Sequence, residues 1–516
     1  MTLAESLKKA TPQGPPHLVI EALAGTGKTT TLVEGLKLVK GGKPTIKPSP
    51  QQEAVWDSLK LSKGAGAVSF VAFNKSIASE LQQRVPEGCT ASTMHSLGLK
   101  AVTRNLGRLA INANRLDNII ASALDKDLRD VRKNDFELLR ATTQLVGLCK
   151  MNLTEEGRGW GDTLDQLASY YDVELNGSRD RVYDLVPKVL DLCKDVDRDR
   201  QIDFNDMIWL PVVLGLPVAM NDLLLVDECQ DLNKCQQALA GKAGRRLVFC
   251  GDAHQAIYGF AGADALSMET LKTELGNSPQ GCEVLPLTVT RRCGKAIVEE
   301  ARKIVPAFEA HEDNCSGTLS KESFKGAEDG SNSYMGAVRD GDMCLCRVNA
   351  PLVSQCFRFL KDGRKAKIQG RDIGQGLIRT IKKLSATSVS DLVSRLSDYH
   401  CREVEKEQAK RNPNENRIIT LNDRYDCIMV FTEGTSSVDE VTNKIETIFA
   451  DDQREGVHFS SIHRAKGLES KRVFLLEPTG ATVPHPMAKS AWQKEQEMNL
   501  RYVAITRAIE ELVYVG

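Results

Sequence analysis

The sequence predicts an α/β protein with parallel β-sheets, on three observations. Short runs rich in Val, Ile, Leu and Phe recur between longer helical patterns, as buried parallel strands with helical crossovers do. One of these runs leads directly into a glycine-containing turn and a helical pattern. Two long stretches, residues 95–221 and 371–455, lack comparable runs and resemble helical insertions. The ten predicted strands are residues 17–22, 67–73, 222–227, 245–250, 283–289, 342–348, 425–431, 457–462, 472–477 and 511–515.

Length and composition indicate a soluble globular protein of several domains. The chain has 516 residues, which at roughly 150 residues per domain allows three to four domains. An apolar fraction of 41% and a charged fraction of 27% exclude disordered, collagen-like and low-complexity classes. Lys and Arg number 68 and Asp and Glu 69, giving a net charge of -1. Any polyanion must therefore meet a local basic channel, because there is no global positive field.

The cysteines and the chain's hydropathy indicate an intracellular, membrane-free setting. The 14 cysteines are scattered, and the one close pair, Cys344 and Cys346, has no second pair or His cluster to complete a zinc site. This pattern favours reduced thiols. No run of about 18 apolar residues occurs, and residues 1–16 are polar, so we expect neither secretion nor a membrane span.

The predicted strand at 17–22 carries the strongest chemical signal. Gly-Thr-Gly-Lys-Thr and a helical pattern follow it. Backbone N–H groups around Gly25 and Gly27 would cradle phosphates, Lys28 would reach the β and γ oxygens, and the Thr29 hydroxyl would ligate Mg²⁺. Because strand, turn and helix come in the required order, we expect a nucleotide to bind here. The binding residues are Ala24, Gly25, Thr26, Gly27, Lys28, Thr29 and Thr30.

The predicted strand at 222–227 ends in the paired carboxylates Asp227 and Glu228. A carboxylate in the position of Asp227 coordinates Mg²⁺, and its neighbour Glu228 can polarise an attacking water. The Mg²⁺ ligands are therefore expected to be Thr29 and Asp227. Together with a phosphate loop, this pairing predicts hydrolysis rather than binding alone.

An ordered series of motifs between Val19 and Val515 resembles the UvrD/Rep-type superfamily 1 DNA helicases. The matching segments are residues 227–231 (DEXQD), 250–263 (GDxxQxIYxFRGA), 287–293 (LxxNYRS), 461–469 (TxHxxKGLE) and 501–508 (YVAxTRA), with two short DNA-contact motifs at 72–75 and 93–97.

The resemblance implies roles for individual residues. Gln255 senses the γ-phosphate, Arg292 is a second γ-phosphate arginine, and Arg507 is an arginine finger. Glu469 holds the ribose, with Gly467 beside it. The implied catalytic set is Lys28, Asp227, Glu228, Gln255, Arg292 and Arg507. The implied DNA contacts are Phe73, Asn74, Thr93, His95, Tyr258, Phe260 and His463.

The sequence departs from the family pattern at several positions. Arg291 stands where the family has a Tyr that stacks on adenine, and Ala261 replaces the Arg of FRGA. A guanidinium plane can provide such stacking. The glutamine that reads adenine normally precedes the phosphate loop. Here the candidates for this glutamine are Gln13, Gln51 and Gln52.

The implied fold comprises two RecA-like parallel-sheet P-loop motor domains, each with an inserted, mostly helical subdomain. If Arg292 and Arg507 reach a phosphate held at Lys28, the nucleotide lies between two α/β domains. The expected segments are residues 1–94 and 204–280 for the first motor domain, 95–203 for its insertion, 281–370 and 456–516 for the second motor domain, and 371–455 for the second insertion.

The implied function is that of an ATP-dependent DNA helicase that moves 3′ to 5′ on single-stranded DNA. Its cofactors are ATP and Mg²⁺, and its partners are single-stranded DNA and junctions of single and double strands. Two alternatives stay open: a translocase that strips proteins with little unwinding, and a non-hydrolysing nucleotide-gated scaffold. The intact Lys28, Asp227, Glu228, Arg292 and Arg507 argue against the scaffold. The expected location is the cytoplasm or nucleoid, or the nucleus or a viral replication site.

Overall fold

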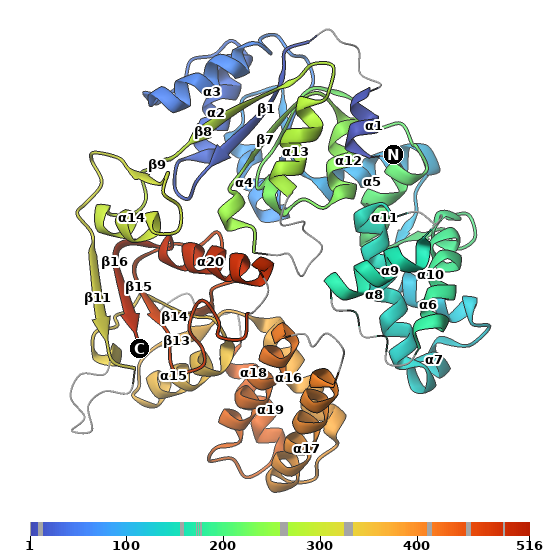
Figure 1. The fold of residues 1–516 in the computed structure, drawn as a ribbon, viewed down its shortest axis with the longest axis vertical. Helices are drawn as coiled ribbons and strands as arrows, with labels where there is room; N and C mark the ends of the chain where they lie inside the picture. Colours follow the sequence, from blue (N-terminus) through green and yellow to red (C-terminus); the bar gives the residue numbers. More distant parts are fainter. Residues whose placement is uncertain are drawn as a thin grey trace. The chain divides into compact units, whose positions relative to one another are not determined.

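The computed structural model describes residues 2–8, 14–154, 159–171, 173, 175, 178–257, 267–324, 334–409, 415–449, 456–488 and 491–516. The chain divides into two compact units, which Figure 1 shows as ribbons. Unit 1 comprises Met1–Leu23 and Gly27–Leu287, and unit 2 comprises Ala24–Thr26 and Thr288–Gly516. Parallel sheets in both units confirm the predicted α/β class.

Unit 1 is built on a six-stranded sheet in the order β3-β2-β6-β7-β1-β8, in which every pairing is parallel. The strands are β1 (His17–Ala22), β2 (Val68–Ala72), β3 (Cys89–Thr93), β6 (Asn221–Val226), β7 (Gly244–Gly251) and β8 (Cys282–Leu287). The predicted division at 280/281 is wrong, because β8 pairs along β1 from His17 to Ala22 and so completes the first sheet.

Alternating residues of the strands bury opposite faces of this sheet. Leu18 and Ile20 of β1 belong to a core shared with α2 (Lys28–Val39), α3 (Pro50–Lys60) and α4 (Lys75–Arg84). Val19 belongs to a second core, shared with α5 (Met94–Leu106), α11 (Phe204–Val213), α12 (Lys234–Ala243), α13 (Ser267–Gly276) and α1 (Leu3–Lys8). Helices therefore cover both faces of the sheet.

The first insertion is helical in its described part, apart from one short ribbon. Its helices are α6 (Arg115–Ala123), α7 (Leu128–Asn134), α8 (Phe136–Asn152), α9 (Trp160–Tyr170) and α10 (Arg179–Lys194). The ribbon pairs β4 (Ala110–Ile111) with β5 (Gln201–Ile202). Buried residues of these helices continue into the second core of unit 1.

Unit 2 contains a second parallel six-stranded sheet in the order β11-β16-β15-β12-β14-β13. Its strands are β11 (Thr318–Glu322), β12 (Met343–Cys346), β13 (Ala366–Ile368), β14 (Val457–Ser461), β15 (Ser470–Leu476) and β16 (Ala508–Val515). A two-stranded pair joins β9 (Val289–Thr290) and β10 (Glu309–Ala310). The helices are α14 (Lys295–Arg302), α15 (Asn349–Lys361), α16 (Arg371–Leu384), α17 (Val389–Gln408), α18 (Glu415–Thr432), α19 (Val438–Ile448) and α20 (Ala491–Ile505).

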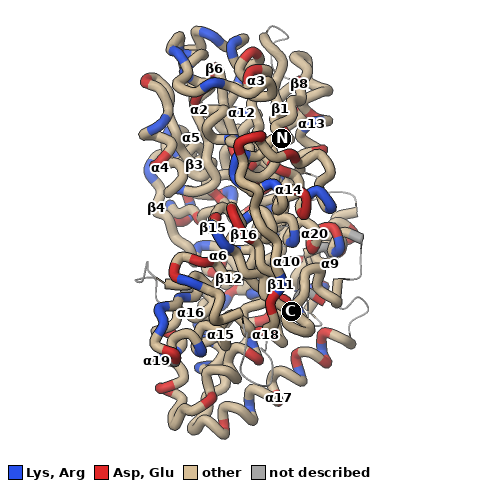
Figure 2. The backbone as a smooth tube through the Cα atoms, turned by 90° about the vertical axis from the view of Figure 1, so that its left-hand side faces the viewer, with Lys and Arg blue, Asp and Glu red and all other residues tan. Residues whose placement is uncertain are grey.

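Figure 2 shows Lys and Arg interspersed with Asp and Glu along the backbone of both units. This distribution agrees with the net charge of -1, so attraction of a polyanion depends on local groups. No helix in the described ranges combines the length and apolar character that crossing a membrane requires.

Candidate functional site

Several side chains predicted to act on nucleotide and DNA follow the carboxyl ends of strands in the unit 1 sheet. The phosphate loop follows β1, Asp227 follows β6, and Phe73 follows β2. Since parallel strands share their carboxyl edge, these groups gather at one edge of the sheet, where α/β proteins bind ligands. The ends of β2 and β6 are joined directly, because the backbone N–H of Asp227 donates to the carbonyl of Val71 at 3.0 Å.

The phosphate loop depends on two glycines with positive φ, 68° at Gly25 and 81° at Gly27. A Cβ on Gly25 would come within 2.5 Å of the Thr290 Oγ1. Gly27 is the N-cap of α2, and no described side chain caps that end of the helix. The first-turn N–H groups of α2 therefore face the position where an anion binds at a helix N-terminus.

Four side chains of unit 1 meet at the start of α2. The Nζ of Lys28 lies 3.4 and 3.5 Å from the two carboxylate oxygens of Glu228. The Thr29 hydroxyl donates to Asp227 Oδ2 at 3.2 Å, and the Glu228 N–H donates to Asp227 Oδ1 at 2.9 Å. The structure thus brings together the predicted phosphate-binding lysine, both predicted Mg²⁺ ligands and the predicted water-polarising carboxylate.

The carboxylates in this cluster outnumber the positively charged side chains. Burial, and then the negative charge of Glu228, raise the pKa of Asp227 above its ordinary value. Burial alone would lower the pKa of Lys28, but the carboxylates of Glu228, Asp252 and Asp227 outweigh it and raise that pKa. A divalent cation would supply the missing charge. The hydroxyl of Thr29 and the carboxylate of Asp227 are oxygen ligands of the kind Mg²⁺ prefers, so the donor set fits this ion.

A chain of hydrogen bonds extends the cluster toward β7. The Nε2 of Gln230 donates to Glu228 Oε2 at 2.6 Å, and its Oε1 accepts the Asp252 N–H at 3.1 Å. Gln255 in turn donates to Asp252 Oδ2 at 2.7 Å. Gln255, predicted to sense the γ-phosphate, is therefore connected to Lys28 and Glu228 through Gln230 and Asp252. Gln230 was not predicted as a site residue, although it stands inside the DEXQD motif.

The structure separates the three candidates for reading adenine. Gln52 is 6% exposed, and its amide is engaged at both ends: Oε1 accepts the Ser49 N–H at 3.0 Å and Nε2 donates to Thr31 Oγ1 at 2.9 Å. It completes a capping box at the start of α3 and ties α3 to α2. Gln51 is half-buried. Gln13 lies outside the described residues.

Two of the predicted DNA contacts have structural roles of their own. Asn74 caps α4 by accepting the Ile77 N–H at 2.9 Å, and Thr93 caps α5 by accepting the Ser96 N–H at 3.2 Å. Capping fixes the direction in which these helices leave the sheet. Phe73, beside the first cap, is 55% exposed, which is unusual for a large apolar side chain at the end of a buried strand.

A second exposed aromatic side chain, which sequence reasoning missed, stands near the predicted DNA contacts. Phe204 opens α11, is 57% exposed, and meets the ring of His95 edge-on with 6.4 Å between ring centroids. The signal in the sequence was an aromatic residue directly after Asp203, a good helix N-cap. Burial lowers the pKa of His95 below its ordinary value, so its ring is neutral at neutral pH.

A pocket of about 320 Å³ in unit 1 joins the predicted DNA contacts to the carboxylates. Its lining includes Phe73 and His95 as well as Asn205, Asp227 and Asp231. Predicted DNA contacts and a predicted Mg²⁺ ligand therefore line one pocket.

The predicted ATP residues of unit 2 are paired with one another or buried. Arg292 Nε lies 2.5 Å from Glu469 Oε2, so the predicted γ-phosphate arginine and ribose carboxylate form an ion pair. Arg291, in the position of the family's stacking Tyr, donates its backbone N–H to the Gly25 carbonyl at 2.9 Å. Gly467 follows β14 with a φ of 86°, in the same motif as Glu469.

Arg507 is buried in unit 2, and His463 is half-buried there. Arg507 is 1% exposed, and its guanidinium donates to the carbonyls of Val503 and Leu468, both at 3.0 Å, and to Thr506 Oγ1 at 3.1 Å. Burial and the neighbouring charges of Arg347 and Arg464 lower the pKa of His463 to about 3. Tyr258, Phe260 and Ala261 lie outside the described residues.

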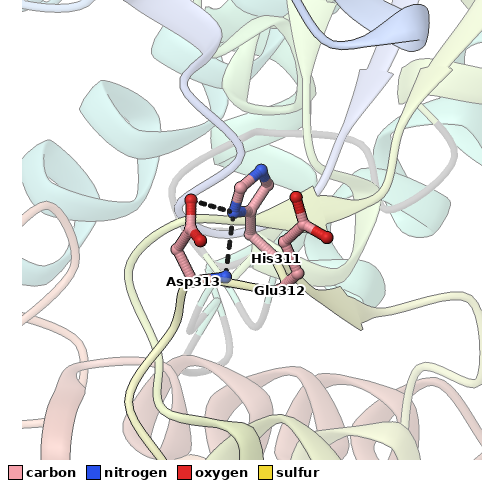
Figure 3. Close-up of side chains that lie close together, drawn as sticks. All are labelled: His311, Glu312 and Asp313. Atoms are coloured by element: carbon pink, nitrogen blue, oxygen red, sulfur yellow. Dashed lines mark hydrogen bonds and ion pairs between the residues drawn. The ribbon is translucent and has the colours of Figure 1, made fainter.

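Metal-ligating side chains also gather in a loop of unit 2 (Figure 3). Ligand atoms of His311, Glu312 and Asp313 lie within 4.8 Å of one another. The Asp313 N–H donates to His311 Nδ1 at 3.3 Å, and both acidic residues are exposed. Exposed acidic groups of this kind occur commonly without an ion, and we assign the cluster no role.

Two family models match the chain. The UvrD/REP helicase N-terminal domain matches residues 3–275, more than half of the chain. This chain belongs to the UvrD/Rep helicase family. A second model, the UvrD-like helicase C-terminal domain, matches residues 353–515. The first UvrD/Rep match contains the phosphate loop and the DEXQD segment, and the second contains the TxHxxKGLE and YVAxTRA segments.

The relatives of this UvrD/Rep protein are distant and longer. F-box DNA helicase protein 1 of Schizosaccharomyces pombe is 23% identical over 96% of this chain and 55% of its own length. The ATP-dependent DNA helicase PcrA of Bacillus subtilis is 25% identical over 57% of this chain and 38% of its own length. The ATP-dependent DNA helicase Rep of Escherichia coli is 28% identical over 38% of this chain and 30% of its own length. The chain thus spans about half or less of the relatives it matches.

Proposed function

We propose that the chain is an ATP-dependent DNA helicase motor that binds Mg²⁺ and ATP at the phosphate loop before α2 and moves 3′ to 5′ along single-stranded DNA. Family membership supports ATP and DNA as its ligands. The observation that carries the proposal is the pocket that joins Phe73 and His95 to Asp227. DNA bound at Phe73 and His95 would share this pocket with Asp227, the predicted Mg²⁺ ligand.

The chemistry follows from the groups at the start of α2. Lys28 neutralises charge on the bound phosphates, and a Mg²⁺ ion held by Thr29 and Asp227 supplies further positive charge when bound. Glu228 accepts the proton of the attacking water, and Lys28 and Gln230 hold its carboxylate in place.

Coupling to DNA follows from the strand ends. Phe73 lies two residues beyond Val71, whose carbonyl accepts the N–H of Asp227. A base stacked on Phe73 therefore contacts the chain two residues from the carbonyl that accepts the Asp227 N–H. Stacking tolerates every base, because each has an aromatic face, and this is the contact that a translocating motor needs.

Strand separation on tailed duplexes tests the proposal. We expect ATP-dependent separation of a duplex with a 3′ single-stranded tail and little separation with a 5′ tail. Turnover that DNA stimulates without strand separation would instead indicate a translocase. Nucleotide binding without any turnover would indicate a scaffold and contradict the proposal.

A further inference from the structure

Five charged side chains form a cluster in unit 1, at the junction of the first insertion and α11. Three are almost completely buried: Arg115 of α6 is 1% exposed, and the side chains of Lys150 of α8 and Asp206 of α11 are 0% exposed. Asp203 is 6% exposed, and Asp199 lies at the rim. None of these residues belongs to the nucleotide site described above.

Asp206 is the centre of the cluster. Its Oδ1 accepts from Lys150 Nζ at 2.7 Å, and its Oδ2 accepts from Arg115 Nη1 at 2.7 Å and from the Asp203 N–H at 2.9 Å. Lys150 also donates to Asp203 Oδ2 at 3.1 Å, and Arg115 Nε to Asp199 Oδ2 at 2.9 Å. Burial would raise the pKa of Asp206, but Lys150 and Arg115 outweigh it and lower that pKa.

The cluster encloses the first turn of α11. Asp203 is the N-cap, and it forms a reciprocal capping box with Asp206, whose N–H donates to Asp203 Oδ1 at 2.8 Å. Phe204, the exposed ring beside His95, is the residue between the cap and Asn205 of the pocket. Two helices of the insertion therefore hold the turn that presents both residues.

Stability alone does not account for such an arrangement. Buried ion pairs are often no more stabilising than well-packed apolar side chains of similar volume, whereas they fix geometry through several directed bonds. Three directed bonds to one carboxylate define where the first turn of α11 lies. A close contact then fixes α11 on α5, since a Cβ on Gly98 of α5 would lie 2.1 Å from the Met207 carbonyl of α11.

We propose that Arg115, Lys150 and Asp206 are positioning residues for DNA binding: they lock the first turn of α11 so that Phe204 stays against His95, which lines the pocket. They touch neither nucleotide nor DNA. The inference rests on the proposed function and deepens it, because it gives the first insertion a part in how unit 1 engages single-stranded DNA.

A neutral variant tests the role without leaving a buried charge unpaired. It combines Arg115→Leu, Lys150→Met, Asp203→Ser and Asp206→Leu, and Ser keeps a capping hydroxyl at the N-cap. We expect a melting temperature equal to or above that of wild type and unchanged turnover without DNA. The DNA concentration for half-maximal ATPase stimulation should rise about fivefold or more, the lower end of the effect of losing one stacked base.

Two further variants complete the test. The pair Lys150→Met and Asp203→Ser removes one cation and one carboxylate, leaves the Arg115–Asp206 bridge, and should shift half-maximal stimulation in the same direction by less. If the neutral variant does not fold, the DNA concentration for half-maximal stimulation of this double variant tests the inference instead. The control Asp165→Ala with Arg179→Ala removes an exposed ion pair of the same insertion and should shift nothing.

Adding Phe204→Ala to the neutral variant tests whether the cluster acts by positioning the Phe204 ring. If the cluster acts by positioning that ring, the added change costs little beyond the effect of the neutral variant. Fully additive effects would contradict that positioning. If the neutral variant folds and needs the same DNA concentration as wild type for half-maximal ATPase stimulation, the inference is wrong. The proposed function still stands in that case, provided that DNA stimulates the wild-type protein. Absence of stimulation in wild type would count against the proposed function itself.

Discussion

Glu228 occupies a backbone conformation that few side chains adopt. Its φ is 52°, in the left-handed region, and such strain costs on the order of 1–3 kcal/mol at a residue other than glycine. The conformation aims its carboxylate at Lys28 and Gln230, which hold it from two sides. Strain of this kind concentrates at functional sites, and here it supports the catalytic assignment of Glu228.

Replacing Glu228 by Gln tests that assignment. The amide keeps the size and one acceptor oxygen but cannot take a proton from water, so we expect ATP to bind and turnover to fall by roughly 10²–10⁴. Binding of a fluorescent ATP analogue and phosphate release measure the two effects separately. Glu53→Gln, an exposed change on α3, is the matched control. Loss of ATP binding in Glu228→Gln would make Glu228 a structural residue.

His17 gives unit 1 a pH-dependent stability. Burial, and then the charge of Arg246, lower its pKa from 6.5 to about 4, and its Nδ1 accepts the Leu247 N–H at 3.0 Å. Between these two pH values the unfolded chain binds a proton that the folded chain does not, so stability falls as the pH falls. Over the whole window the loss approaches about 3 kcal/mol.

Thermal melting at pH 7 and pH 5 measures this effect. We expect His17→Asn, which keeps an acceptor for the Leu247 N–H, to lose less stability between these pH values than wild type. An identical loss in both proteins would show that other groups cause the pH dependence.

At the scale of elements, the proposed DNA surface is made by the exposed rings after β2 and at the start of α11. Phe73→Ala and Phe204→Ala should each weaken binding of single-stranded DNA by about 1–3 kcal/mol, because each removes a stacking face. Fluorescence anisotropy of a labelled oligonucleotide measures this. Phe136→Ala removes an equally exposed ring at the start of α8 and should leave affinity unchanged. Equal affinity in all four proteins would remove both rings from the DNA surface.

The sequence predicted elements best where local pattern and chemistry coincide. β1, the phosphate loop and α2 follow one another as expected, and so do β6 and its carboxylates. Residues 425–431 were wrongly predicted as a strand and lie in α18, because an apolar run can also be the buried face of a helix. Cys427, Ile428 and Phe431 are the buried residues of that run, a spacing that fits one helical face.

Other strands, helix ends and contacts could not be predicted from the local sequence pattern. The edge strand β3 is largely polar, and the three residues of β13 are too few to show a pattern. Helix α17 begins after an N-cap at Ser388, and β11 has exposed residues along most of its five positions. The buried charge cluster joins residues up to 91 positions apart, so only the tertiary fold reveals it.

At the scale of the whole molecule, the family resemblance implies that Arg292 and Arg507 of unit 2 take part in turnover. Arg292 of unit 2 is bonded to a carboxylate that is 49% exposed, whereas Arg507 is bonded to buried backbone groups. We expect Arg292→Ala to lower turnover by roughly 10³ with little change in melting temperature. Arg507→Ala should also lower the melting temperature, because it leaves buried carbonyls without their donor. Unchanged turnover in Arg292→Ala would refute its assignment to the nucleotide.

The central claim is that single-stranded DNA on unit 1 controls hydrolysis at the neighbouring carboxylates. Its most direct test is phosphate release as a function of oligonucleotide concentration, with Lys28→Ala as the inactive reference and Phe73→Ala as the DNA-surface variant. We predict a saturable rise in wild type, a curve displaced to higher DNA concentration in Phe73→Ala, and no turnover in Lys28→Ala. Turnover that is indifferent to DNA in wild type, or that persists in Lys28→Ala, would contradict it.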